Sequence, residues 1–211
     1  KTFIELGIGD GLENNTLALL FDNWKGLWID ASTQSIQSIN NHFSNIITAK
    51  KLQVIESFIT TDNIDGLISN NIECNEIDLL SVDIDGNDYH VLKSITCVKP
   101  RVIVIEYNAK FKPPTLFCMD YYESHSWKGD DCFGVSLQFL EENIDGYCLV
   151  SCNITGSNAF FVREDLVDDN FVGPFTAEHH YAPARYYLAG FSSGHPATYE
   201  TLQRSLTMRS Y

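Results

Sequence analysis

A glycine-rich segment near the start of the chain has the residue types and spacing of a ligand-binding loop. Residues 5–11 read Glu-Leu-Gly-Ile-Gly-Asp-Gly and close a short apolar run at residues 3–6. Glycines at such a place permit a tight turn and let a ligand approach the backbone closely. Asp30 ends the next apolar run, 19 residues after the last of these glycines, and an acid there accepts the ribose hydroxyls of a nucleoside. The combination predicts a nucleoside site that includes Gly7, Gly9, Gly11 and Asp30.

The residues around this loop indicate which nucleoside it binds. A dinucleotide-binding loop has its third glycine where this chain has Leu12. Glu5 stands just before the glycines, where a carboxylate suits the amino group and sulfonium of S-adenosylmethionine better than a pyrophosphate. Asn14 and Asn15 start a helix expected at residues 12–21, whose free N–H groups favour the methionine carboxylate, although helix capping accounts for them equally well. A further expected cofactor contact follows the third apolar run, at Ser57.

A second group of polar residues follows the next two apolar runs. Asp83 ends the run at residues 77–83, and Asp85 and Asp88 follow it; Glu106 ends the run at residues 102–106, and Asn108 follows it. The carboxyl ends of parallel strands meet at one edge of a sheet, so we expect these side chains to lie near the bound cofactor. Oxygen ligands of this kind suit Mg²⁺ or a similar cation. The predicted metal ligands are Asp83, Asp85, Glu106 and Asn108.

The same polar residues also fit two roles that need no metal. In the first, Asp85, Glu106 or His90 acts as the general base that takes the proton of a hydroxyl. His90 lies inside an expected helix, so a buried structural histidine is an equal alternative. In the second, the acids form an ordinary solvated turn, because Asp-Gly and Asn-Asp are common turn sequences. Asp83 has a further candidate role, which is contact with the cofactor.

The order of apolar runs and helical segments predicts the elements that position both groups. Five apolar runs alternate with helical segments, which predicts a parallel sheet with helices on both faces. Two further strands, at residues 147–152 and 158–162, flank a Thr-Gly-Ser turn and predict a closing hairpin. Between these parts, residues 110–133 are aromatic and lack a clean period, and loops of this length usually have a function. We expect this segment to be a substrate lid, with satellite core packing as the competing hypothesis. The expected substrate contacts are Tyr107, Tyr121, Tyr122, His125 and Trp127.

Several of these segments together resemble a known enzyme family. The E-x-G-x-G-x-G run resembles motif I of class I S-adenosylmethionine-dependent methyltransferases, and the closing hairpin resembles their reversed last strand. The combination resembles FkbM-like methyltransferases over most of residues 2–165. The resemblance implies a Rossmann-like α/β fold with a seven-stranded, mostly parallel sheet, an antiparallel last strand and helices on both faces. It also implies methyl transfer to an oxygen, often on a sugar or a polyketide-type natural product. The segments that carry it are residues 5–20, 26–32, 78–89, 100–108 and 158–163.

Composition and charge limit the classes of molecule that this protein is expected to bind. The chain has 14 Lys and Arg against 28 Asp and Glu, a net charge of −14, which argues against nucleic acid and against anionic membranes. A neutral or cationic small molecule or glycan suits this charge better. No stretch approaches the ~18 apolar residues of a membrane span, and we find no signal peptide. The six cysteines lack CxxC spacing, so we expect reduced thiols and a cytoplasmic location.

The length of 211 residues predicts one methyltransferase domain over residues 1–211, with a C-terminal extension at residues 165–211. The chain opens without a Met and enters its first strand at once, so we expect it to be excised from a longer chain with covalently linked neighbouring domains. An O-methyltransferase is the leading hypothesis. The alternatives are a non-catalytic cofactor-binding module and, with less support, an NAD-dependent oxidoreductase.

Overall fold

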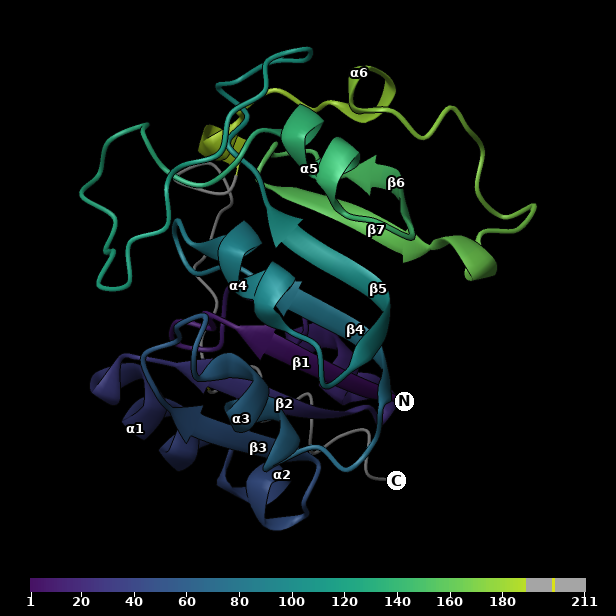
Figure 1. Cartoon of the computed structure of the whole chain (residues 1–211). Coiled ribbons are helices and arrows are strands. Elements are labelled where there is room, and N and C mark those ends of the chain that lie inside the picture. The colour runs from purple at the N-terminus through teal and green to yellow at the C-terminus, as the bar shows by residue number, and fades with distance from the viewer. Residues whose placement is uncertain (189–198, 200–211) are drawn as a thin grey trace.

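The computed structural model describes residues 1–188 and Tyr199 of the 211-residue chain. Its centre is a seven-stranded sheet with the order β3-β2-β1-β4-β5-β7-β6 (Figure 1). Strands β1 to β5 pair in parallel, whereas β7 runs antiparallel to both β5 and β6. This arrangement confirms the predicted fold class, including the closing hairpin. The strands are β1 (Thr2–Leu6), β2 (Lys25–Asp30), β3 (Leu52–Glu56), β4 (Glu76–Val82), β5 (Lys99–Glu106), β6 (Tyr147–Cys152) and β7 (Asn158–Arg163).

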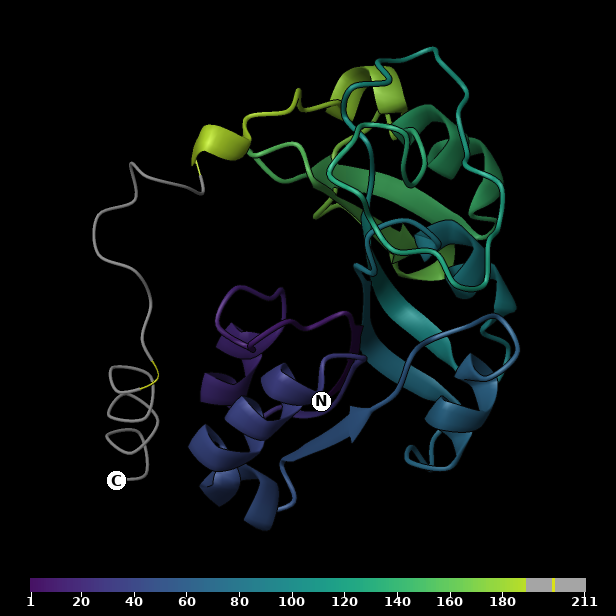
Figure 2. The same ribbon diagram turned by 90° about the vertical axis from the view of Figure 1, so that its left-hand side faces the viewer.

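Helices cover both faces of the sheet. Figures 1 and 2 show α3, α4 and α5 on one face and α1 with η1 on the other. Among the described residues, no helix is both long and apolar enough to cross a lipid bilayer. The helices are η1 (Leu17–Asp22), α1 (Thr33–His42), α2 (Ser44–Thr48), α3 (Ile64–Ser69), α4 (Asp88–Ser94), α5 (Leu137–Asn143), η2 (Glu164–Leu166), α6 (Ala177–His180) and η3 (Tyr186–Leu188).

Each face of the sheet has its own hydrophobic core. Successive side chains of a strand point to opposite faces, and β2 shows this directly. Leu27 and Ile29 belong to the core under α3, α4 and α5, whereas Trp28 between them belongs to the core under α1. All three side chains are fully buried. Burial on both faces explains why these strands appear in the sequence as continuous apolar runs.

The helix predicted at residues 12–21 is shorter than expected. Residues 9–16 form turns and bends, and only the 3₁₀ helix η1 (Leu17–Asp22) follows. The reason is a competing acceptor, because the backbone N–H groups of Asn15 and Thr16 donate to the carboxylate of Glu5. These N–H groups are therefore tied to β1 rather than to a helical turn. The connection from β1 to β2 therefore begins as a loop that the buried carboxylate of Glu5 holds in place.

Candidate active site

The carboxyl ends of β1, β2, β3 and β4 surround a cavity of about 590 Å³. This size lies within the range of small-molecule sites, and the position is where ligands bind in open parallel sheets. Five of the nine predicted cofactor residues line the cavity, together with Asp85 and His125 from the other predicted sets. The five are Gly7, Gly9, Asp30, Ser57 and Asp83.

The glycine loop presents its backbone to this cavity. Gly7 has φ +77°, and a Cβ added there would lie 1.7 Å from the carbonyl oxygen of Asp83. Only glycine therefore allows the backbone after β1 to lie this close to the backbone after β4. Gly9 has φ +53° and no heavy atom within 4 Å of an added Cβ, so its backbone faces open space. The loop thus leaves room for a ligand directly against the main chain.

Asp30 holds the rim of the cavity beside this loop. One carboxylate oxygen accepts the Gly9 N–H at 2.9 Å, and the other accepts the Ser32 N–H at 2.7 Å. A carboxylate has about four lone-pair positions, so each oxygen retains one for a ligand hydroxyl. The side chain is partly exposed at the end of β2. The ribose contact of Asp30 stays a prediction.

Glu5 lies behind the loop, not in the cavity. Its side chain is 1% exposed, and it accepts the N–H groups of Asn15 and Thr16 at 2.8 and 3.1 Å as well as the Thr16 hydroxyl. Trp28 in turn donates its indole N–H to that hydroxyl at 2.8 Å. Burial raises the pKa of the Glu5 carboxyl. These contacts correct the expected contact with a cationic ligand, because the carboxylate is already used to hold residues 15 and 16.

The other predicted residues of this loop also act within the protein. Asn14 accepts the N–H of Leu17, the first residue of η1, at 2.8 Å. Asn15 donates its side-chain N–H to the Ser81 hydroxyl at 3.0 Å and so ties the loop to β4. Gly11 packs against the side chains of Trp28 and Ile39. Asn15 thus has a structural role, whereas the Nδ2 atom of Asn14 is buried without a partner among the described residues, so its expected contact with the methionine carboxylate stays a prediction.

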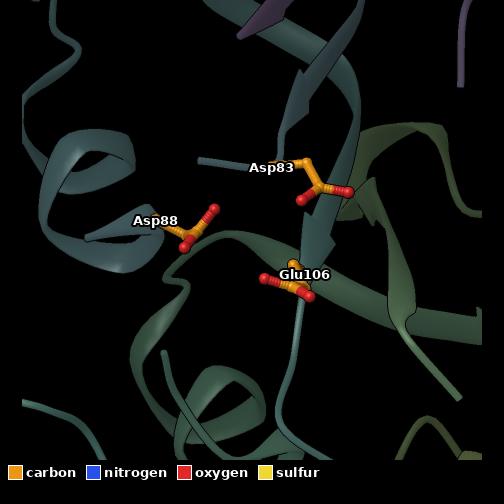
Figure 3. Close-up of side chains that lie close together, drawn as sticks. All are labelled: Asp83, Asp88 and Glu106. Atoms are coloured by element: carbon orange, nitrogen blue, oxygen red, sulfur yellow. The ribbon is translucent and has the colours of Figure 1, made fainter. Parts of the chain in front are cut away.

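Three carboxylates converge next to the cavity (Figure 3). Asp83 follows β4, Asp88 begins α4, and Glu106 ends β5. One oxygen of each lies within 4.8 Å of the others, and Figure 3 shows the side chains pointing toward one another. Asp83 belongs to both places, since it also lines the cavity. We call these three residues the carboxylate cluster.

No basic side chain among the described ion pairs compensates the carboxylate cluster, because none of these pairs joins a Lys or Arg to any of its members. Burial and the neighbouring carboxylates raise the pKa of Glu106 and of Asp83. Burial also raises the pKa of Asp88, against the opposing effect of the N–H groups that it accepts from Ile84 and Gly86. A buried group of acids is stable only if it takes up protons or binds a cation.

The cluster differs from the predicted metal set in two members. Asp88 replaces Asp85, because hydrogen bonds from Ile84 and Gly86 turn its carboxylate inward at 2.7 and 2.8 Å. Asp85 itself has φ +58° and lines the cavity instead. Asn108 is fully buried, and its amide donates to the carbonyl oxygens of Asp131 and Phe133 at 2.9 and 3.1 Å. Asn108 therefore holds the end of the long loop rather than a metal.

His90 and Tyr107 also have structural roles. The His90 Nε2 atom lies 2.7 Å from the carbonyl oxygen of Met119, so this ring fastens the long loop to α4 and is not placed as a base in the cavity. Tyr107 is fully buried and donates its hydroxyl to the carbonyl oxygen of Ala182 at 2.6 Å. Both positions correct the expected contacts with the substrate or its proton.

The long loop at residues 110–133 lies beyond the carboxyl ends of the strands (Figure 1). His125 is its only predicted contact that lines the cavity, and its Nε2 atom lies 3.1 Å from the Asp85 carbonyl oxygen. The Tyr121 hydroxyl accepts the Thr61 N–H at 3.3 Å, and the Tyr122 carbonyl accepts the Asn87 side chain at 2.9 Å. Trp127 donates to Asp130 within the loop. The loop is thus fastened at the rim of the cofactor cavity, and its role as a lid stays a prediction.

A sequence comparison decides the family. The family model described as "Methyltransferase FkbM domain" matches residues 2–126, which include the glycine loop, Asp30 and the whole carboxylate cluster. The chain belongs to this FkbM methyltransferase family. The family and the fold agree with the class I architecture, so the protein is an S-adenosylmethionine-dependent methyltransferase.

Solved structures share the fold of this methyltransferase at low sequence identity. A protein from Staphylococcus aureus assigned as a caffeoyl-CoA O-methyltransferase is 15% identical, with a TM-score of 0.53 over 77% of this chain and 76% of that chain. A protein from Klebsiella pneumoniae assigned as an O-methyltransferase is 15% identical, with a TM-score of 0.48 over 76% and 71%. The likeness to the Staphylococcus aureus protein shows the fold alone. No curated protein sequence matches the methyltransferase.

Two residues of the methyltransferase have places in the site that its sequence pattern does not predict. Asp88 belongs to the predicted acidic group but not to the predicted set of metal ligands. The signal for it is its place at the start of α4, where an acidic side chain often accepts backbone N–H groups. Phe58, next to the predicted Ser57, lines the cavity with 49% of its surface exposed. An exposed aromatic ring directly after a strand end is the signal that identifies it.

Proposed function

We propose that this methyltransferase transfers the methyl group of S-adenosylmethionine to a hydroxyl oxygen of a sugar, glycan or related natural product, with the help of a divalent cation. The proposal rests on the position of Asp83 between two parts of the site. It lines the cofactor cavity and belongs to the carboxylate cluster. A hydroxyl held at the cluster therefore lies beside the cofactor, as in-line transfer requires.

The cavity residues fit the cofactor. Gly7 and Gly9 leave the backbone open to the nucleoside side of the cavity, and Asp30 retains lone pairs for two ribose hydroxyls. The exposed ring of Phe58 offers a flat apolar surface on the same wall. S-Adenosylmethionine, when bound, supplies a methyl group on a positively charged sulfur. The acidic residues of this wall suit such a charge.

The carboxylate cluster fits a divalent cation. One oxygen of Glu106 is buried and has no hydrogen-bond partner among the described residues. Carboxylate oxygens are the ligands that Mg²⁺ and similar ions prefer. A cation held there by Asp83, Asp88 and Glu106 would lower the pKa of a nearby hydroxyl. This chemistry suits a sugar hydroxyl, which is a poor nucleophile at neutral pH.

The reaction needs one proton acceptor. As the hydroxyl oxygen forms its bond to the methyl carbon, the carbon–sulfur bond breaks and the hydroxyl proton leaves. A cluster carboxylate takes that proton. A mechanism without a metal is the second candidate, with ionised Glu106 as the base. Burial and the neighbouring acids raise the pKa of Glu106, which makes the ionised form a stronger base but leaves little of it at neutral pH, so this route requires alkaline pH. The two mechanisms differ in their dependence on added cation.

The charge of the protein limits the acceptor. The net charge of −14 and the acids at the site disfavour phosphorylated or carboxylated acceptors. We therefore propose that the acceptor is a neutral or cationic small molecule or glycan. Nucleic acids and membrane surfaces are not proposed as partners. An acceptor attached to a neighbouring domain of the same polypeptide is compatible with this chemistry.

A methyl-transfer assay tests the proposal. The protein is incubated with methyl-labelled S-adenosylmethionine and a panel of neutral and amino sugars, each with Mg²⁺ and with EDTA. We expect label in at least one sugar, and a loss of at least about tenfold in EDTA that Mg²⁺ restores. Full activity in EDTA would favour the metal-free base. Labelling of an amine or a carbon acceptor, with every hydroxyl left unlabelled, would contradict O-methylation.

A further inference from the structure

Asn158 begins β7 opposite Glu106 of the carboxylate cluster, and its amide oxygen has no hydrogen-bond partner among the described residues. The match to the family model ends at residue 126, so Asn158 lies outside it. The side chain is 7% exposed, and its Oδ1 atom is buried without a hydrogen-bond partner among the described residues. A buried amide oxygen without a partner costs about 1–3 kcal/mol. Such an atom takes its hydrogen bond or its ligand bond from a water molecule or an ion.

The pairing of β5 with β7 places this amide next to Glu106. Glu106 and Asn158 are directly opposite each other in the antiparallel register. The next pair along the ladder, Tyr107 and Ser157, is a hydrogen-bonded pair, because the Tyr107 N–H donates to the Ser157 carbonyl at 2.8 Å. Such pairs alternate with non-hydrogen-bonded pairs, in which opposite side chains come closest. Glu106 and Asn158 form a pair of the close kind, on the same face of the sheet.

The backbone of Asn158 is held in this position from the adjoining turn. The side-chain oxygen of Asn153 accepts the N–H groups of Ser157 and Asn158 at 2.9 and 3.0 Å. The Asn153 N–H donates to the Asn158 carbonyl at 2.9 Å. These bonds occupy the main chain of Asn158 and leave its side chain for another partner. The amide is thus preorganised beside Glu106.

We propose that Asn158 is the fourth protein ligand of a divalent cation held by Asp83, Asp88 and Glu106. This inference rests on the cation in the proposed function and adds to it a neutral oxygen from the antiparallel strand. Glu106 and Asn158 are opposite each other in the strand register, and one oxygen of each, Glu106 Oε2 and Asn158 Oδ1, is buried without a partner among the described residues. A water molecule could donate to both oxygens, but only a cation also balances the charge of the three ionised carboxylates, which no Lys or Arg of the described ion pairs contacts. Three carboxylates and one amide form an all-oxygen ligand set of the kind that Mg²⁺ and Mn²⁺ accept.

Titration of the whole chain with Mn²⁺, followed by electron paramagnetic resonance, tests this ligand. Asn158→Leu keeps the approximate volume but removes the oxygen, and we expect it to weaken Mn²⁺ binding by about tenfold or more. Asn158→Asp keeps an oxygen at the same place, and we expect it to bind Mn²⁺ at least as tightly as the wild type. S-Adenosylhomocysteine affinity serves as the folding control, because Asn158 does not line the cofactor cavity.

The outcomes separate this inference from the proposed function. Unchanged Mn²⁺ affinity in Asn158→Leu would overturn the role of Asn158 while the cluster keeps its cation. Weaker Mn²⁺ binding in Asn158→Asp would also overturn it, because the residue would then act as an N–H donor to the carboxylates. If the wild type did not bind Mn²⁺, both the role of Asn158 as a ligand and the proposed cation would be overturned. Methyl transfer to a hydroxyl is measured separately in the labelling assay, so that part of the proposed function would not be affected.

Discussion

Replacement of Glu106 by Gln is expected to lower kcat for methyl transfer by at least about 100-fold. Glu106 belongs to the carboxylate cluster, and the substitution removes both its negative charge and its capacity to take a proton. Glu106 does not line the cofactor cavity, so we expect the affinity for S-adenosylhomocysteine to change by less than about twofold. Single-turnover assays and calorimetry measure the two quantities on the same preparation.

Stability measurements distinguish this effect from damage to the fold. Burial and neighbouring acids raise the pKa of Glu106, so this group stabilises the folded state at low pH and loses that contribution as pH rises through the raised pKa. Without added cation, Glu106→Gln should therefore be at least as stable as the wild type at alkaline pH. The matched control is Glu56→Gln, at the carboxyl end of β3 but outside both the cluster and the cavity. Equal loss of kcat in both variants would contradict the role of Glu106.

Replacement of Gly7 by Ala is expected to destabilise the protein by about 3 kcal/mol or more. An added Cβ would lie 1.7 Å from the carbonyl oxygen and 2.7 Å from the carbonyl carbon of Asp83. Both atoms are backbone, so no side-chain rotation relieves the overlap. Relief requires β1 and β4 to separate where the Asp83 N–H donates to the Leu6 carbonyl at 3.0 Å. Urea unfolding measures the change.

Gly129→Ala isolates the contribution of backbone strain to this loss. Gly129 has φ +81°, close to the φ +77° of Gly7, but no heavy atom lies within 4 Å of an added Cβ. We expect this variant to lose only the roughly 1–2 kcal/mol of a left-handed alanine. If Gly7→Ala and Gly129→Ala lose similar stability, the close approach of β1 and β4 is not what requires glycine at position 7.

Most of the sheet was predictable because burial imposes a strong pattern. Residues 102–105, for example, are apolar throughout, since both faces of β5 are covered. The reversed hairpin of β6 and β7 was predictable from the Thr-Gly-Ser turn between two short strands. The helix expected at residues 12–21 was not, because a residue on the neighbouring strand β1, Glu5, takes its N–H groups. Local sequence pattern contains no information on such a competing acceptor.

The site was predictable by position but not by orientation. Strand ends identified Asp30, Asp83 and Glu106, because parallel strands bring their carboxyl ends to one edge. Whether a polar side chain then points into the site depends on its own hydrogen bonds. Asn108 turns away because two carbonyl groups of the long loop accept its amide. The predicted extension at residues 165–211 forms η2, α6 and η3 as far as Leu188, and residues 189–198 and 200–211 lie outside the described residues.

Calorimetric titration with S-adenosylhomocysteine tests most directly whether the cavity at the carboxyl ends of β1 to β4 is the cofactor site. We predict micromolar binding to the wild type, a loss of about tenfold or more in Asp30→Ala because the ribose hydroxyls lose a charged acceptor, and no binding of NAD⁺. Glu56→Ala, at the strand end that pairs with Asp30, should bind as the wild type does. Equal affinity in Asp30→Ala and the wild type, or binding of NAD⁺ in place of S-adenosylhomocysteine, would contradict this assignment of the cavity.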